Sequence, residues 1–361
     1  MAQNGYRVAN VVASRSLRRA PRYLPVMLLF MTNRCNLRCK MCGVCEHNTA
    51  SQPKPELSTA EWKAVIDSAK KLGTSLISVS GGEPLLRPDV YEVIRYARDR
   101  NIAVHLCSNG VLFDRETAEK LRESRVNTVS ISIESPVKEI HELLRGPDSF
   151  EPATNAIRML REFAPEVNVG INYLITTANF RNMSAMIKFA EDLDVNQIKF
   201  APIHTNLLHK RKRIEQYGDL IFKGEDLDVL DDEVHALMKA AERSKIQTAS
   251  AVFFSGVSRL YREPRRFRCY AGYAVCAINP SGVVTPCCDM EGSLSVKDKP
   301  LEEIWRSPEF QQLRSQVTRC SSSCWDTTNA ELSLRLRIAS LFGEFAQTWR
   351  DIEFYYGRKN R

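Results

Sequence analysis

The sequence predicts an α/β fold, in which a partial (β/α)6 barrel is followed by a small domain made of a β-hairpin and a helix. Short apolar runs typical of strands alternate with amphipathic stretches typical of helices through the first two thirds of the chain. Repeated strand–helix units imply a parallel sheet. Six such units are too few for a complete eight-stranded TIM-like barrel. With 361 residues and 43% hydrophobic residues, the chain can form one large domain and a smaller one.

The order of the elements follows from this alternation. The predicted strands are Val26–Met31, Leu76–Val79, Ala103–Cys107, Thr128–Ile133, Val167–Ile175 and Gln197–Ala201. The predicted helices are Thr59–Leu72, Asp89–Arg100, Arg115–Glu123, Pro152–Phe163 and Asn182–Leu193. The expected divisions are a basic N-terminal segment at 1–24, the barrel at 25–250, the small cysteine-containing domain at 251–328 and an amphipathic C-terminal helix at 329–361.

Cys35, Cys39 and Cys42 stand in the stretch Cys-Asn-Leu-Arg-Cys-Lys-Met-Cys, directly after the first predicted strand. Three thiolates at this spacing can bind three irons of a [4Fe-4S] cluster, whereas an electron-transfer cluster normally has four cysteines. The fourth iron is then open to another molecule, at the strand ends where barrel active sites lie. Zinc is the alternative, because Cys39/Cys42 and Cys42/Cys45 are Cys-x2-Cys pairs. A nearby second pair at zinc-finger spacing is missing, and we interpret Cys45 as a non-ligand.

The Cys-x3-Cys-x2-Cys motif resembles the signature of radical S-adenosylmethionine (SAM) enzymes. In that family the open iron binds the amine and carboxylate of SAM. Reductive cleavage of SAM then gives a 5′-deoxyadenosyl radical that abstracts a hydrogen atom from the substrate. Met41 departs from the pattern, since an aromatic residue is more common there. The resemblance implies SAM and a [4Fe-4S] cluster as cofactors, a partial barrel as the fold, and flavodoxin or ferredoxin as the electron donor.

Short motifs after the next three strands are similar to the SAM-binding positions of this family. Gly81-Gly82-Glu83-Pro84 resembles the motif that binds the SAM amino group, and glycines let the backbone approach a ligand closely. The motifs after the third and fourth strands resemble positions that contact the ribose and carboxylate of SAM, although an Asp is more common where Glu134 stands. A simple turn is the alternative for Ser108-Asn109-Gly110. The predicted SAM contacts are Gly81, Gly82, Glu83, Pro84, Ser108, Asn109, Ser132, Glu134 and Arg145, of which Arg145 fixes either SAM or the substrate.

A second set of cysteines follows the barrel. Cys269 and Cys287 flank a predicted hairpin with the turn Asn279–Gly282, and a predicted helix, Leu301–Arg314, leads to Cys320-x3-Cys324. This pattern resembles the start of the SPASM domain in its shortened "twitch" form. The resemblance implies one auxiliary [4Fe-4S] cluster, bound by Cys269, Cys287, Cys320 and Cys324. Cys276 or Cys288 could replace a member of this set, and zinc is again the alternative.

Three functions agree with these motifs. The first is a radical SAM enzyme acting on a small molecule, sugar or lipid, with the auxiliary cluster assisting oxidation or rearrangement. The second is a peptide-modifying radical SAM maturase; relatives of that kind often carry an N-terminal peptide-recognition domain, and only 34 residues precede Cys35 here. The third is a non-catalytic iron–sulfur or zinc protein that binds or transfers electrons. His204 and Tyr173 are candidates for a general base, with a structural role as the alternative, and the sequence names no catalytic residue.

The charges and the apolar pattern of the sequence indicate which kinds of partner the chain could contact. The net charge is +8, with basic runs at Arg15–Arg22 and His209–Arg213 that either attract an anionic substrate or form solvated faces. No nucleic acid is expected, since no RNA-binding module is visible. An apolar stripe near the C-terminus either lies on a membrane surface or packs on the core or a dimer interface: Leu334, Ile338, Leu341, Phe345, Trp349 and Ile352.

The expected location is the cytoplasm, with membrane association at its inner face if the C-terminal stripe touches lipid. No apolar run approaches the roughly 20 residues that cross a membrane. No secretory signal is evident. Eleven cysteines without an export signal indicate metal binding in a reducing compartment rather than disulfides.

Overall fold

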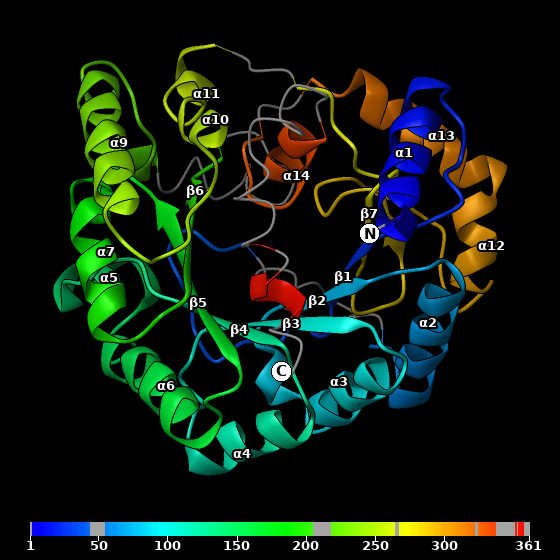
Figure 1. Ribbon diagram of the computed structural model, residues 1–361, viewed down its shortest axis with the longest axis horizontal. Coiled ribbons are helices and arrows are strands. Elements are labelled where there is room, and N and C mark those ends of the chain that lie inside the picture. The colour runs from blue at the N-terminus through cyan, green and yellow to red at the C-terminus, as the bar shows by residue number, and fades with distance from the viewer. Residues whose placement is uncertain are drawn as a thin grey trace.

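The computed structural model describes residues 2–43, 55–204, 218–263, 267–321, 324–336, 351 and 353–356. One sheet of eight strands forms its centre, in the order β6-β5-β4-β3-β2-β1-β7-β8. The sheet curves around a central space while helices cover its outer face (Figure 1). Among the described residues, no pairing joins β6 to β8, so the barrel is open. The predicted α/β partial barrel is confirmed.

The first six strands are parallel and match the predicted ones. They are β1 (Val26–Phe30), β2 (Leu76–Ser80), β3 (Ala103–Ser108), β4 (Thr128–Ser132), β5 (Asn168–Ile175) and β6 (Gln197–Pro202). Side chains alternate between the two faces of each strand. In β1, Met27 and Leu29 are fully buried beneath the helices, whereas Leu28 and Phe30 are half-buried. The half-buried set therefore faces the barrel interior.

The outer helices begin at sequence signals that favour them. Ser58 and Glu61 form a reciprocal capping box at the start of α2, and Asp114 caps α4 through the Thr117 amide. The helices α1, α5, α9, α10 and α11 were not predicted. The longer helices are α1 (Ala2–Ser16), α2 (Thr59–Lys71), α3 (Val90–Asp99), α4 (Arg115–Glu123), α5 (Lys138–Arg145), α6 (Phe150–Phe163), α7 (Met183–Asp192) and α9 (Asp226–Glu242). Short α10 (Ala251–Phe254) and α11 (Arg259–Arg262) follow α9.

The predicted hairpin is β7 (Val275–Ile278) and β8 (Val284–Thr285), and it extends the barrel sheet. β7 pairs in parallel with β1, with Val26 opposite Val275 and Leu29 opposite Ile278. β8 then pairs antiparallel with β7. The edge of β1 is thereby covered. The sequence predicted this hairpin within a separate small domain, but it is continuous with the barrel.

The predicted helix Leu301–Arg314 is two helices, α12 (Leu301–Arg306) and α13 (Pro308–Arg319). Pro308 disfavours helical geometry at the residue before it, and Ser307 is extended, with φ −68° and ψ 152°. The Ser307 side chain instead accepts a hydrogen bond from the Phe310 amide and caps α13. The break lets α13 run on to Arg319, next to Cys320.

The C-terminal segment closes the barrel at the N-terminal ends of the strands. After α14 (Asn329–Arg335), the backbone of Phe354 and Tyr356 accepts hydrogen bonds from Asn168 and Asn127 at 2.8 and 3.3 Å. Phe354 and Leu334 are both buried, at 3% and 1% exposure. The described part of this segment therefore packs on the protein's own core. The rest of the predicted stripe, from Ile338 to Ile352, lies outside the described residues.

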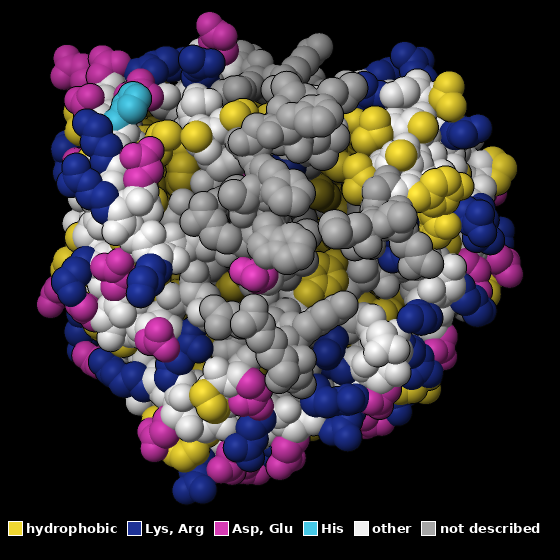
Figure 2. All heavy atoms as spheres, in the orientation of Figure 1, with side chains coloured by type: hydrophobic (Ala, Val, Ile, Leu, Met, Phe, Trp, Pro, Cys, Tyr) yellow, Lys and Arg dark blue, Asp and Glu magenta, His cyan; other side chains and the backbone are white. Residues whose placement is uncertain are grey.

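Charge is distributed without a single dominant sign on the visible face. Figure 2 shows Lys and Arg side chains interspersed with Asp and Glu around the rim of the molecule. The predicted basic run His209–Arg213 lies outside the described residues. No described helix is long and apolar enough to cross a membrane.

Candidate active site

The three-cysteine loop lies at the C-terminal end of β1. Cys35 and Cys42 are half-buried and Cys39 is buried, with 8% exposure. The Leu37 amide lies 3.5 Å from Cys35 Sγ, and the Lys40 amide donates to the carbonyl of Leu144 at 2.8 Å. The loop is thus fixed both internally and by the end of α5. Cys45 lies outside the described residues.

Gly81 and Gly82 pack directly on the backbone of this loop. A Cβ added at Gly81 would lie 2.5 Å from the Thr32 carbonyl oxygen, and one added at Gly82 would lie 2.1 Å from that of Arg34. The Gly82 amide also donates to the Thr32 carbonyl at 2.7 Å. The sequence analysis attributed the two glycines to close approach of a ligand. In the structure, the surface that they approach is the cysteine loop.

Glu83 joins the ends of β2 and β3. Its carboxylate accepts hydrogen bonds from the amides of Asn109 (2.8 Å) and Leu85 (3.1 Å) and from the Ser108 hydroxyl (3.0 Å). Its side chain is fully buried. Glu83 therefore positions Ser108 and Asn109, and Pro84 starts the short 3-10 helix that follows.

Asn109 and Arg145 lie beside different cysteines of the loop. Asn109 Nδ2 donates to Asn36 Oδ1 at 2.7 Å and lies 3.8 Å from Cys35 Sγ. Arg145 Nη1 lies 3.9 Å from Cys39 Sγ. An amide donor and a cation beside the thiols favour their anionic, iron-binding form.

Glu134 holds Arg145 in place. Its Oε1 accepts two hydrogen bonds from the guanidinium, at 2.9 and 2.6 Å, and its Oε2 accepts the Leu174 amide at 2.6 Å. Glu134 is 1% exposed, so this is a buried ion pair in which one carboxylate oxygen accepts both guanidinium hydrogen bonds. Ser132, on the same strand end, is half-buried on the inward face.

The two candidate bases are engaged in structural bonds. The Tyr173 hydroxyl donates to the Asn179 carbonyl at 2.6 Å, and His204 Nε2 accepts the Trp325 amide at 2.8 Å. Both side chains are buried. These contacts favour the structural alternative for both residues.

The later cysteines meet at a cavity of about 180 Å³. Cys269, Cys287, Cys320 and Cys324 all line it, and they come from three separate segments of the chain. The amides of Ala271 and Asp289 lie 3.4 Å from the sulfurs of Cys269 and Cys287, respectively. Burial raises the pKa of Cys269 to about 12, so this thiol needs a cation to bind as a thiolate.

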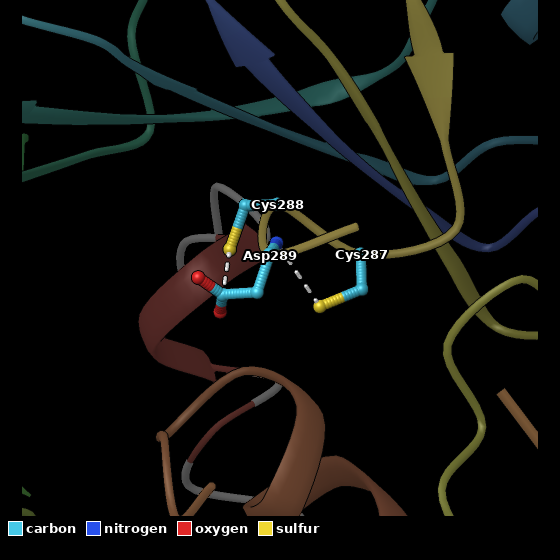
Figure 3. A group of neighbouring side chains, drawn as sticks. All are labelled: Cys287, Cys288 and Asp289. Atoms are coloured by element: carbon cyan, nitrogen blue, oxygen red, sulfur yellow. Dashed lines mark hydrogen bonds between the residues drawn. The ribbon is translucent and has the colours of Figure 1, made fainter. Parts of the chain in front are cut away.

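The two spare cysteines are placed differently. Cys276 is fully buried within β7 and is absent from the lining of this cavity. Cys288 is also absent from the lining; its thiol lies 3.6 Å from the Asp289 carboxylate, whereas Cys287 accepts the Asp289 amide (Figure 3). The geometry therefore argues against Cys276, whereas Cys288 stays an alternative ligand, because the ligand atoms of Cys287, Cys288 and Asp289 all lie within 4.8 Å of one another.

Arg15 is the part of this site that sequence reasoning missed. Its Nε donates to the Cys269 carbonyl at 2.9 Å, and its side chain lines the same cavity. In the sequence, Arg15 stands out only as part of a basic run. The amphipathic pattern of α1, with Val8, Val11 and Val12 on its packed face, was the available signal.

Comparison with known proteins agrees with both cysteine sites. Residues 29–190 match the family model of the radical SAM superfamily, and residues 269–326 match that of an iron–sulfur cluster-binding domain, SPASM. An AdoMet-dependent heme synthase from Oleidesulfovibrio alaskensis is 31% identical over 79% of this chain and 75% of its own. The chain belongs to the radical SAM superfamily. It is therefore an enzyme that uses SAM and a [4Fe-4S] cluster, and its SPASM domain adds auxiliary iron–sulfur binding.

Other members of the superfamily are also similar to this chain. A PqqA peptide cyclase from Gluconobacter oxydans is 28% identical over 80% of this chain and 78% of its own. The crystal structure of Streptococcus suis SuiB bound to its precursor peptide SuiA matches the fold with a TM-score of 0.63. That match covers 84% of this chain and 70% of SuiB at 18% identity, so it bears on the fold alone.

The donor sets in the structure fit the groups that the superfamily uses. Three cysteines on one loop, flanked by Asn109 and Arg145, suit a cluster with one open iron. Four cysteines around one cavity suit a cluster in which every iron has a protein ligand.

Proposed function

We propose that this chain is a peptide-modifying radical SAM maturase. Its SAM-binding cluster is held by Cys35, Cys39 and Cys42, and one auxiliary cluster by Cys269, Cys287, Cys320 and Cys324. The observation that carries the peptide assignment is the similarity to a PqqA peptide cyclase along 80% of this chain. The sequence analysis preferred a small-molecule, sugar or lipid substrate, and the relatives favour its alternative.

The roles of the remaining predicted residues follow from their contacts. Glu83 and Glu134 act as positioning residues, because their carboxylates already accept hydrogen bonds or ion pairs from the protein. Backbone groups of Gly81–Glu83, with Ser132 and Asn109, then remain to contact SAM. The proposed division is a barrel at 25–250 and an auxiliary domain at 251–328 whose hairpin continues the barrel sheet.

When bound, the cluster and SAM supply a 5′-deoxyadenosyl radical that removes a hydrogen atom from the substrate. The protein must then bind the substrate inside the barrel and exclude water. An auxiliary cluster with a cysteine at every iron would be suited to accept an electron from the substrate radical rather than to bind the substrate. A flavodoxin or ferredoxin is the proposed source of the first electron.

A second candidate is modification of a tetrapyrrole. Among the relatives described above, the heme synthase has the higher identity, 31% against 28% for the peptide cyclase. Peptides and porphyrins differ in shape but share carboxylate groups. The two candidates are therefore separated by experiment on the substrate rather than on SAM cleavage.

The test is formation of 5′-deoxyadenosine by anaerobically reconstituted protein given SAM and dithionite, measured by mass spectrometry against Cys35→Ala. Deuterated peptides and deuterated coproporphyrin III are then compared for deuterium transfer into 5′-deoxyadenosine. Transfer from a peptide supports the first proposal, and transfer from the porphyrin alone replaces it with the second. SAM cleavage equal to that of Cys35→Ala would overturn the assignment of the three-cysteine site.

A further inference from the structure

A cavity of about 330 Å³ lies inside the barrel. Its walls are largely aliphatic, with Val26 and Leu28 of β1, Leu76 of β2 and Leu332 of α14 among them. Lys199 of β6 and Tyr355 of the C-terminal segment also line it. The cavity thus combines apolar walls with Lys199 and with three further charged side chains, Glu331, Arg335 and Asp351, and no cysteine of either site lines it.

The ammonium of Lys199 lies over an aromatic ring. Its Nζ is 4.8 Å from the centroid of Tyr355, a cation–π distance. Burial opposes the charge of Lys199, but Tyr355 and Cys107 favour it, and its pKa lies above the ordinary value. Burial raises the pKa of Tyr355 and of Cys107, and neither of these side chains is a carboxylate.

The two carboxylates that line this cavity, Asp351 and Glu331, are already paired. Asp351 is the acidic group that acts on Lys199, but its carboxylate binds Arg335 and the amide of Gln247. Arg335 also pairs with Glu331 at 2.6 Å. Within the described part of the chain, no Asp or Glu forms an ion pair with Lys199.

His105 does not supply the missing charge either. Burial lowers its pKa well below the ordinary value, so the ring is neutral. Its two ring nitrogens face the hydroxyls of Ser78 at 3.1 Å and Ser130 at 2.9 Å. An ammonium held in an apolar cavity without a carboxylate costs free energy, and a bound anion would offset that cost.

The strand register relates Lys199 to the proposed SAM site. Asn172 of β5 is opposite both Ser132 of β4 and Lys199 of β6. Two strand spacings, about 10 Å, therefore separate the backbone of Lys199 from that of Ser132. Asn172, which lies between the two positions in the sheet, is half-buried.

We infer that Lys199 binds a carboxylate of the substrate inside the barrel. This inference rests on the proposed function and narrows it to substrates that carry an acidic group, bound about 10 Å from the end of β4 where Ser132 lies. A glutamyl or aspartyl side chain of a peptide and a propionate of a porphyrin both provide that chemistry. Tyr355 holds the ammonium toward the cavity, so the C-terminal segment forms part of the substrate site.

The test uses the reconstituted full chain with SAM and no reductant, so its outcome does not depend on turnover. Octanoate and octanol serve as probes, because they share an alkyl chain and differ in charge. Isothermal titration calorimetry on the wild type should give a preference for octanoate of about tenfold or more, as expected for a charge-assisted hydrogen bond. Lys199→Met should abolish the preference and Lys199→Arg should retain it.

Lys188→Met is the matched control, because it removes an exposed lysine that pairs with Asp192 on α7. It should leave the preference unchanged. Absence of a preference in the wild type, or the same preference in Lys199→Met, would overturn the inference. A folding defect in Lys199→Met would be recognised by its iron content, and Lys199→Gln then replaces it.

A second arm identifies the source of the carboxylate. The wild type and Lys199→Met are compared with a glutamyl peptide against its glutaminyl counterpart, and with coproporphyrin III against its tetramethyl ester. If Lys199→Met loses the preference for the acid form in only one of the two ligand pairs, that pair identifies the substrate class. If Lys199→Met keeps the preference in both pairs, the result contradicts a role for Lys199. Failure of 5′-deoxyadenosine formation would instead contradict the proposed function and leave these binding results intact.

Discussion

The two cysteine sites are built in opposite ways. At the barrel end, three cysteines lie on one loop of eight residues, Cys35–Cys42, and the rest of the fold holds that loop in place. At the auxiliary site, four cysteines come from the segment before β7, the segment after β8 and the segment after α13. Local sequence thus defines the first site, and tertiary packing assembles the second.

Because the two cysteine sites are built differently, we expect substitutions to affect them differently. Residues that clamp the three-cysteine loop, such as Gly82 and Arg145, should affect its iron without touching the auxiliary site. The auxiliary site depends on the fold as a whole, since β7 is part of the main sheet. The following experiments compare the two sites directly.

The largest effect is expected from the three-cysteine loop. Replacing Cys35, Cys39 or Cys42 with Ala should reduce 5′-deoxyadenosine formation to background and lower the iron content from about eight to about four per chain. Ferrozine iron analysis and mass spectrometry measure the two quantities. Cys276→Ala is the control, because Cys276 is fully buried within β7 and lies outside the three-cysteine loop, and it should retain both. SAM cleavage at the wild-type rate in Cys39→Ala would contradict the assignment of the three-cysteine loop as the site of SAM cleavage.

The auxiliary site should give the complementary result. Replacing Cys269 and Cys287 with Ala should also remove about four irons per chain while SAM cleavage persists, because the barrel loop is intact. Substrate turnover should be lost. Cys276→Ala and Cys288→Ala should keep the full iron load, since neither lines the cavity. Loss of zinc instead of iron, or loss of iron in Cys288→Ala, would require a different ligand set.

Arg145 tests the clamp on the barrel loop. Arg145→Met leaves Glu134 buried without its ion-pair partner, so the free energy of unfolding should fall by about 3–5 kcal/mol. Denaturation in guanidinium chloride under anaerobic conditions measures this change. Arg115→Met removes the exposed pair with Glu119 and should cost less than about 0.5 kcal/mol. Similar losses of stability in Arg145→Met and Arg115→Met would show that the buried Glu134–Arg145 ion pair stabilises the fold no more than an exposed pair does.

Gly82→Ala is a milder test of the contacts that hold the three-cysteine loop in place. A Cβ at residue 82 must displace the Arg34 carbonyl, so Gly82→Ala should cost about 1–3 kcal/mol and lower iron occupancy of the barrel loop alone. Gly218→Ala adds a Cβ with no atom within 4 Å and should change stability by less than about 0.5 kcal/mol. Full occupancy in Gly82→Ala would mean that the loop does not depend on this contact.

Much of the barrel was predictable because its signals are local. The apolar run at Val26–Met31 and the turn motif at Gly81–Pro84 each fall at the expected strand and strand end. The division of the predicted helix Leu301–Arg314 was missed although Pro308 signalled it. The role of Glu83 was not predictable, because its partners Ser108 and Asn109 lie 25 and 26 residues away.

The sequence by itself determined the superfamily chemistry of this protein. Three cysteines at this spacing can bind three irons wherever the loop lies in the fold, because ligand type and spacing set the number of irons that can be bound. Only the tertiary structure decided which later cysteines share a cavity and that β7 joins β1. It also decided that Lys199 faces Tyr355 from 156 positions earlier in the chain. Such contacts are made by packing between distant segments, and no local pattern of residues records which segments will meet.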